Sequence, residues 1–153
     1  MFERYTETAR QALRFARDEA HALGSLLIEP EHVLLGIVCV GDDITGGIFA
    51  TAALSADRLR QQITQHGPQR TRKEDLEFSS ATKRALLYAA EEADLMVHAL
   101  VLQRHRFTDH IGPAHQLLGL LRDSNRATSI LLSYGIVLDY ARENIASAIL
   151  VRE

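Results

Sequence analysis

A seven-residue pattern that occurs twice constrains the fold of this chain more than any other feature. The pattern is Pro-x-His-x-Leu-Leu-Gly, and it runs over residues 30–36 and again over residues 113–119. A proline suits the first turn of a helix, because its missing N–H has no partner inside the helix there. The apolar residues behind each proline are typical of a buried helix. The chain is therefore predicted to contain the same buried helix twice.

The segments on both sides of this pattern also return. Thr6 is a suitable N-cap, and small and apolar residues recur behind it at helical spacing until about Gly24. A similar segment covers residues 82–93. The shorter helices expected after the pattern cover about 45–53 and 55–65 in the first unit, and about 130–136 and 139–145 in the second. A four-helix unit that occurs twice indicates an internal duplication.

The second unit is longer than the first. Equivalent residues are 73 apart in the first helix and 83 apart afterwards, a difference of ten residues. We expect these extra residues within 94–110, where they lengthen the first helix of the second unit and then form a loop rich in His and Arg. Carboxylate pairs such as Glu91-Glu92 fall on polar helix faces and are expected to be solvated.

The composition favours an all-α fold. Ala, Leu, Arg and Glu are strong helix formers and dominate the chain, whereas only three prolines occur. We predict about eight helices in a single domain, 1–153, in which two four-helix units pack with pseudo-twofold symmetry around one shared core. The predicted first repeat is 1–66, the linker 67–77 and the second repeat 78–150.

Charge and hydropathy exclude several classes of function. The net charge of −3 is mild and has the wrong sign for a nucleic-acid-binding protein. No segment approaches the roughly 18 apolar residues that a membrane-spanning helix needs. The single cysteine, Cys39, permits no intramolecular disulfide and is expected to be a buried small hydrophobe. One thiol without a signal peptide predicts a cytoplasmic protein.

The motifs of catalysis are missing from the sequence. There is no Gly-x-x-x-x-Gly-Lys-[Ser/Thr] run to hold phosphates and no Gly-x-Ser-x-Gly elbow to present a nucleophile. His32 and His115 hold equivalent positions in the two units, and we expect them to pack or cap helices. His98, His105 and His110 match no known ligand spacing. We therefore predict a protein that is not an enzyme and binds neither metal nor cofactor.

The order of these residues resembles a known family. Residues 1–7, which read Met-Phe-Glu-Arg-Tyr-Thr-Glu, and residues 31–37, which read Glu-His-Val-Leu-Leu-Gly-Ile, are similar to the N-terminal domain of ClpC- and ClpA-type unfoldases. That domain is a tandem repeat, and the resemblance covers roughly residues 1–150. In the family the domain lies above an ATPase ring and receives substrates and adaptor proteins, and in some members it binds phosphoarginine.

The resemblance implies a non-catalytic binding module that recognises substrates or adaptors for an AAA+ unfoldase or protease. The alternative is a free-standing accessory protein that docks on the Clp ring or its peptidase and tunes assembly. Implied partners are protein substrates, adaptor proteins or Clp ATPase and peptidase subunits, with no nucleic acid and no membrane. We expect a monomer in isolation.

The resemblance also implies candidate binding residues. Phe2 and Phe78 precede the first helix of each unit and either staple it to the core or line an apolar groove between the units. Tyr5 and Lys83 would flank that groove.

Glu31 is the fifth candidate residue. It lies at a helix N-terminus, where its carboxylate either stabilises the helix dipole or binds a guanidinium group. Its counterpart Ala114 has no carboxylate. Glu29 and Pro30 replace the family's usual Gly-Thr, which removes a backbone donor and adds a charge that repels phosphate. Phosphoarginine binding is therefore not expected.

Overall fold

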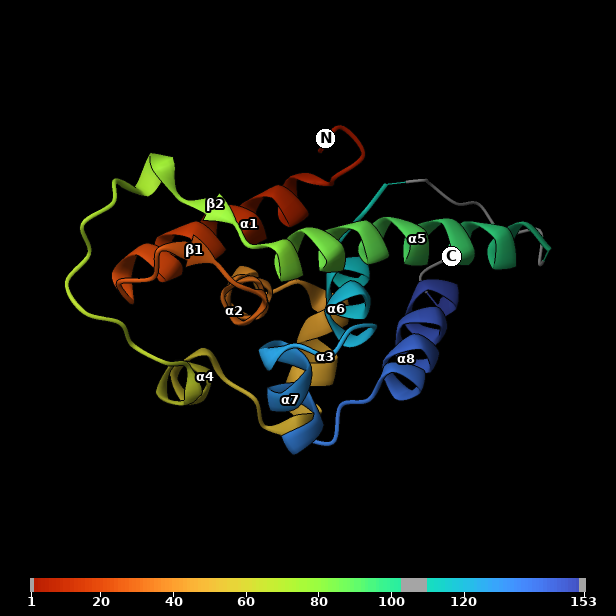
Figure 1. The fold of residues 1–153 in the computed structure, drawn as a ribbon. Coiled ribbons are helices and arrows are strands. Elements are labelled where there is room, and N and C mark those ends of the chain that lie inside the picture. The colour runs from red at the N-terminus through yellow and green to blue at the C-terminus, as the bar shows by residue number, and fades with distance from the viewer. Residues whose placement is uncertain (1, 103–109, 152–153) are drawn as a thin grey trace.

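The computed structural model describes residues 2–102 and 110–151, and almost all of its regular structure is helical (Figure 1). The helices of the first half are α1 (Glu7–Ala22), α2 (Pro30–Val40), α3 (Asp43–Ala52) and α4 (Ala56–Gln62). Those of the second half are α5 (Ser80–Leu102), α6 (Pro113–Leu121), α7 (Arg126–Ser133) and α8 (Leu138–Val151). The remaining elements are the short strands β1 (Leu27–Ile28) and β2 (Glu77–Phe78) and the 3₁₀ helix η1 (Lys73–Asp75). The predicted all-α fold is confirmed.

The helices of the two halves pack in the same way. α1 lies along α2, and α5 lies along α6. α2 also contacts α4 and α7, and α6 makes the equivalent contacts with α8 and α3. Each central helix therefore packs against its own half and against the other half, as pseudo-twofold symmetry requires.

Two glycines allow the paired helices to approach closely. A Cβ atom added to Gly36 would lie 2.1 Å from the carbonyl oxygen of Ala12 in α1. A Cβ atom added to Gly119 would lie 2.2 Å from the carbonyl oxygen of Ala85 in α5. The repeated Leu-Leu-Gly therefore places a glycine where only a hydrogen atom fits between α1 and α2, and again between α5 and α6.

Short extended segments of the two halves pair with each other. β1 pairs in parallel with β2, so that Ile28 lies opposite Phe78. An isolated parallel bridge joins Tyr5 to Ile111 in the equivalent place. The amide of Ser79 donates to the carbonyl of Ile28 at 3.1 Å, and other backbone bonds continue the Tyr5 bridge. The start of each half is thus attached to the loop between the first two helices of the other half.

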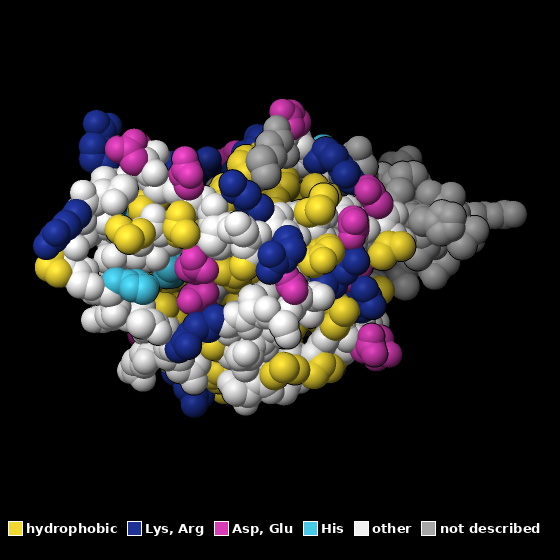
Figure 2. Space-filling view, viewed as in Figure 1, with side chains coloured by type: hydrophobic (Ala, Val, Ile, Leu, Met, Phe, Trp, Pro, Cys, Tyr) yellow, Lys and Arg dark blue, Asp and Glu magenta, His cyan; other side chains and the backbone are white. Residues whose placement is uncertain are grey.

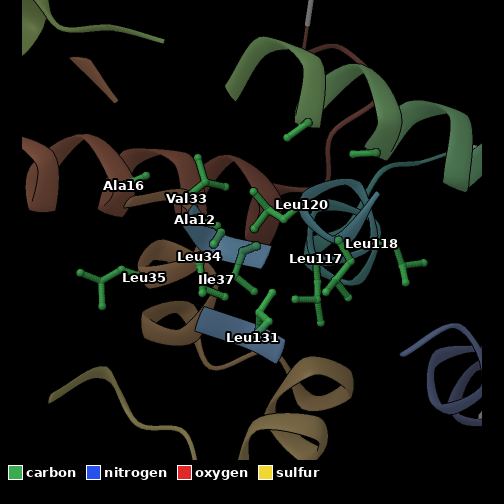
Figure 3. Close-up of a cluster of buried hydrophobic side chains, with 14 of the residues drawn as sticks. Ala12, Ala16, Val33, Leu34, Leu35, Ile37, Leu117, Leu118, Leu120 and Leu131 are labelled. Atoms are coloured by element: carbon green, nitrogen blue, oxygen red, sulfur yellow. The ribbon is translucent and has the colours of Figure 1, made fainter. Parts of the chain in front are cut away.

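The core is continuous across both halves. Figure 3 shows buried side chains of α1, α2, α6 and α7 that meet in its centre; those labelled are Ala12, Ala16, Val33, Leu34, Leu35, Ile37, Leu117, Leu118, Leu120 and Leu131. Leu34, Leu117 and Leu131 are completely buried. Burial of an aliphatic side chain of this size contributes roughly 1.5–3 kcal/mol to stability. One shared core agrees with the prediction.

The second unit differs from the first in its first helix. α1 has 16 residues, whereas α5 has 23 and continues to Leu102. The predicted lengthening of this helix is confirmed. The loop expected after it, which includes His105, lies outside the described residues. The predicted boundaries at 66/67 and 77/78 stay a prediction.

An ion pair is repeated in the two halves. Arg60 of α4 binds Glu19 of α1 at 2.7 Å, and Arg142 of α8 binds Glu92 of α5 at 2.7 Å. Glu92 is only 3% exposed. The expectation that Glu91-Glu92 is solvated is therefore wrong for Glu92, because the guanidinium of Arg142 compensates its charge inside the fold.

In the described residues, no single helix is both long and apolar enough to cross a membrane; α2 and α3 pass by length and composition only as a pair bent by 105°.

Candidate functional site: an apolar groove with a basic rim

Three aromatic side chains lie close together where the extended segments of the two halves pair. The ring of Phe2 lies 4.9 Å from that of Tyr5 and 6.0 Å from that of Phe78, measured between centroids. The Phe2 and Phe78 rings meet edge to face, an arrangement that stabilises aromatic pairs beyond simple burial. Phe78 and Tyr5 are equivalent positions of the duplicated units, because each forms the extended pair with the other half.

A groove of about 280 Å³ opens beside this cluster. Its lining consists of Phe2, Arg10, Leu13, Arg14, Arg17 and Phe78. The two phenylalanines are half-buried, so part of each ring faces the groove. Because positions 10, 14 and 17 are four and three residues apart, α1 presents their three guanidinium groups on one side. We call this site the Phe2–Phe78 groove.

Tyr5 belongs to the aromatic cluster but not to the lining of the groove. Its side chain is 5% exposed and contacts Phe2. Burial disfavours the phenolate and raises the pKa of Tyr5 to about 12. Tyr5 therefore supports Phe2 from within the fold.

Lys83 does not line the Phe2–Phe78 groove either. It lies exposed in the first turn of α5, where its amide donates to the carbonyl of Ser79 at 2.9 Å. Arg10 holds the equivalent position in α1, since its amide donates to Thr6 in the same way. The basic residue that lines the groove is thus Arg10, which is the repeat counterpart of the expected Lys83.

Glu31 occupies a separate place at the start of α2. Its side chain is 9% exposed, and burial raises the pKa of its carboxyl group above the usual range. Arg126 and His66 act in the opposite direction. The structure therefore brings together Phe2, Tyr5 and Phe78 but leaves Glu31 and Lys83 apart from them.

His32 and His115 cap their helices, as expected. Nδ1 of His32 accepts a hydrogen bond from the amide of Glu29 at 2.9 Å, and Nδ1 of His115 accepts one from the amide of Gly112 at 3.0 Å. Burial lowers the pKa of both imidazoles to about 4, so both rings are neutral near pH 7. A neutral ring with one acceptor nitrogen is what this capping requires.

The described residues contain no group of three or more His, Cys, Asp or Glu side chains that could hold a metal ion. Cys39 is half-buried, and burial raises the pKa of its thiol. Its Sγ lies 3.6 Å from a guanidinium nitrogen of Arg60. A protonated thiol in this position is a packing residue and not an activated nucleophile.

The groove contains four residues that sequence reasoning did not single out: Arg10, Leu13, Arg14 and Arg17. A signal for them exists. Three arginines at helical spacing beside the inward-facing Leu13 form a basic stripe next to the apolar face of the first helix. The stripe could be read as a binding edge only once Phe78 was known to pack beside it.

Comparison with known proteins identifies the fold. The family model of the Clp repeat (R) N-terminal domain matches residues 4–105, which is more than half of the chain. This chain belongs to the Clp N-terminal domain family. The predicted family resemblance is therefore confirmed.

Curated relatives match nearly the whole chain over a small part of their own length. This Clp N-terminal domain is 27% identical over 147 residues to "Negative regulator of genetic competence ClpC/MecB" of Bacillus subtilis, which covers 95% of this chain and 17% of that protein. It is 31% identical over 139 residues to the chloroplastic chaperone protein ClpC1 of Oryza sativa subsp. japonica, covering 88% and 14% respectively. The chain spans less than a fifth of either relative.

Solved structures show the same fold. The N-terminal domain of the chaperone ClpD from Arabidopsis thaliana superposes with a TM-score of 0.69 at 23% identity, covering 97% of this chain and 96% of that one. The N-terminal domain of Hsp104 from Candida albicans gives a TM-score of 0.64 at 16% identity, covering 92% and 88%. At these identities the likeness establishes the fold of the Clp N-terminal domain and not its ligands.

Proposed function

We propose that this Clp N-terminal domain is a non-catalytic protein-binding module of the Clp quality-control system. It recognises substrates or adaptor proteins for an AAA+ unfoldase through the Phe2–Phe78 groove. The observation that carries this proposal is the open apolar floor formed by Phe2, Leu13 and Phe78. Aromatic side chains that remain partly exposed beside a hollow are good anchors for a protein partner.

The contacts that hold the floor residues in place support the proposal. Phe78 is held by the β1–β2 pair, and Phe2 packs on the buried ring of Tyr5. A preformed site loses little conformational entropy when a partner binds. The groove also lies where the two halves meet, which is a common location for binding sites.

A binding assay with a defined unfolded protein tests the proposal. Reduced, carboxymethylated α-lactalbumin is the probe, and its binding to the chain is measured by fluorescence anisotropy. Phe2→Ala combined with Phe78→Ala should weaken binding at least tenfold, since loss of an anchoring aromatic side chain costs on the order of 2 kcal/mol. Circular dichroism must show unchanged helicity in the variant.

Leu132→Ala is the matched control. Leu132 is a large hydrophobic residue that is 53% exposed on α7, and it is not part of the groove. Its removal should leave the affinity for the probe unchanged. Equal affinities of the wild type and the double variant would contradict the groove as the binding site.

The identity of the Clp subunit that the chain binds distinguishes the proposed function from the alternative accessory role. The purified chain is mixed with an assembled Clp ATPase ring or with the peptidase alone, and complexes are separated by size. Binding to the ring that increases capture of the unfolded probe supports the proposed function. Binding to the peptidase without the ring and without any unfolded protein would favour the accessory role.

A further inference from the structure

Arg17 is the one guanidinium group on the rim of the Phe2–Phe78 groove that has no acidic partner in the described part of the chain. Its Nε atom is buried and has no hydrogen-bond acceptor among residues 2–102 and 110–151. A guanidinium group without an acidic partner can bind an incoming carboxylate through its other nitrogens. Arg17 is therefore the arginine of this rim whose charge is open to an acidic ligand.

The other two arginines of the rim are already engaged. Arg14 donates to the carboxylate of Glu7 and to the side-chain oxygen of Gln11. Arg10 donates to the carbonyl oxygen of Phe2 at 3.2 Å and lies 3.9 Å from Glu7. The carboxylate of Glu7 thus serves two guanidinium groups, and the charge of Glu3 also acts on Arg10, so Arg17 carries the positive charge of the rim that no acidic side chain of the described residues pairs.

We propose that the Phe2–Phe78 groove selects acidic peptide segments: an aromatic or aliphatic side chain packs on the floor formed by Phe2, Leu13 and Phe78, and a neighbouring carboxylate binds Arg17. This inference rests on the proposed function and specifies its ligand. A guanidinium group binds a carboxylate through charge-assisted, often bidentate hydrogen bonds. A hydrophobic anchor with an adjacent acid therefore satisfies the floor and the rim at once.

The surroundings of the groove favour a peptide over a nucleic acid. The chain carries a net charge of −3, which repels a long polyanion. Figure 2 shows hydrophobic, basic and acidic side chains interspersed on one face of the molecule and no continuous basic field. A short segment with one or two carboxylates needs only the local charge of the rim.

Three labelled peptides test the proposal on the intact chain. The first is Gly-Glu-Phe-Glu-Leu-Glu-Gly, and the others carry glutamine or lysine in place of every glutamate. We expect the glutamate peptide to bind at least fivefold more tightly than the glutamine peptide in anisotropy titrations, and the lysine peptide to bind most weakly. High salt should reduce the preference, because it screens the interaction.

Variants locate the preference. Arg17→Gln should abolish the glutamate preference while the glutamine peptide still binds, and Arg17→Lys should keep part of it. Lys83→Gln is the control, because it removes the same charge from an exposed site outside the groove. Thermal melts establish that all variants fold.

Each outcome supports or overturns the proposal. Equal binding of the glutamate and glutamine peptides overturns the acidic selectivity and leaves the proposed function intact if Phe2→Ala with Phe78→Ala still abolishes binding. A preference that survives Arg17→Gln overturns the role of Arg17. Binding of neither peptide overturns both proposals. Tighter, Arg17-dependent binding of a thymidine oligonucleotide would identify a nucleic acid instead, and a dimer that Phe78→Ala dissociates would identify a second copy.

Discussion

Gly36 of α2 lies so close to Ala12 of α1 that a Cβ atom on Gly36 would stand 2.1 Å from the carbonyl oxygen of Ala12. Gly119 and Ala85 repeat this relationship in the second half, at 2.2 Å. In both cases the added Cβ atom would meet a backbone carbonyl group, which cannot move aside as a flexible side chain would. The close approach explains why the same glycine ends both copies of the repeated motif.

Gly36→Ala should destabilise the fold. The added methyl group must push α1 and α2 apart, and overpacking of this kind costs about 1–3 kcal/mol. Urea unfolding followed by circular dichroism measures the change in free energy. Gly47→Ala is the control, because a Cβ atom there meets nothing within 4 Å and helix propensity favours alanine by about 0.5–1 kcal/mol. Loss of stability in Gly47→Ala but not in Gly36→Ala would refute this packing argument.

Ala53→Gly should stabilise the fold. Ala53 follows α3 as its C-cap with a φ of 59°, in the left-handed region, and Gly135 holds the equivalent position with a φ of 77°. A residue with a Cβ atom pays about 1 kcal/mol there, whereas glycine does not. The expected gain in unfolding free energy is on the order of that amount, and Gly135→Ala should lose a similar amount. A lower melting temperature for Ala53→Gly would count against the assigned cap.

The His32 cap makes stability depend on pH. The unfolded state binds a proton near the ordinary pKa of 6.5, but burial, aided by the nearby charge of His66, lowers the pKa of the folded state to about 4. The unfolded state therefore binds more protons between these two values. The contribution of His32 to the unfolding free energy is fully present above pH 6.5 and decreases as the pH falls towards 4. At roughly pH 5 about 2 kcal/mol of this contribution is lost.

His32→Gln isolates this contribution. Glutamine keeps an acceptor near the amide of Glu29 but cannot be protonated, so the variant should lose less stability than the wild type between about pH 7.5 and pH 5. Urea unfolding at a series of pH values measures both proteins. His66 and Glu19 also act on the imidazole, and both remain in the variant. Parallel pH profiles for the two proteins would show that His32 does not carry the dependence.

The sequence predicts the duplicated fold well because the apolar residues of the repeated motif form part of the core. Pro30 and Pro113 begin α2 and α6, and the predicted helix end near Gly24 agrees with the structure. The pairing of Arg142 with Glu92 was not foreseen, because the two residues are 50 positions apart and only tertiary packing brings them together.

The candidate site was predicted in part. Phe2 and Phe78 were identified through the family resemblance, and the structure brings their rings together. The sequence does not single out Arg17, because helical periodicity indicates which side of α1 it occupies but not which residues lie opposite. Phe78 lies beside α1 because β1 and β2 pair. This pairing depends on contacts between residues far apart in the chain.

Site-resolved binding tests the central claim most directly. Two-dimensional ¹⁵N–¹H NMR spectra of the chain are recorded while reduced, carboxymethylated α-lactalbumin is added. We predict that the amide signals of Phe2, Leu13, Arg17 and Phe78 shift together with one affinity, and that those of α7 do not. Saturable shifts confined to α7 and α8, with the groove signals unchanged, would contradict the account.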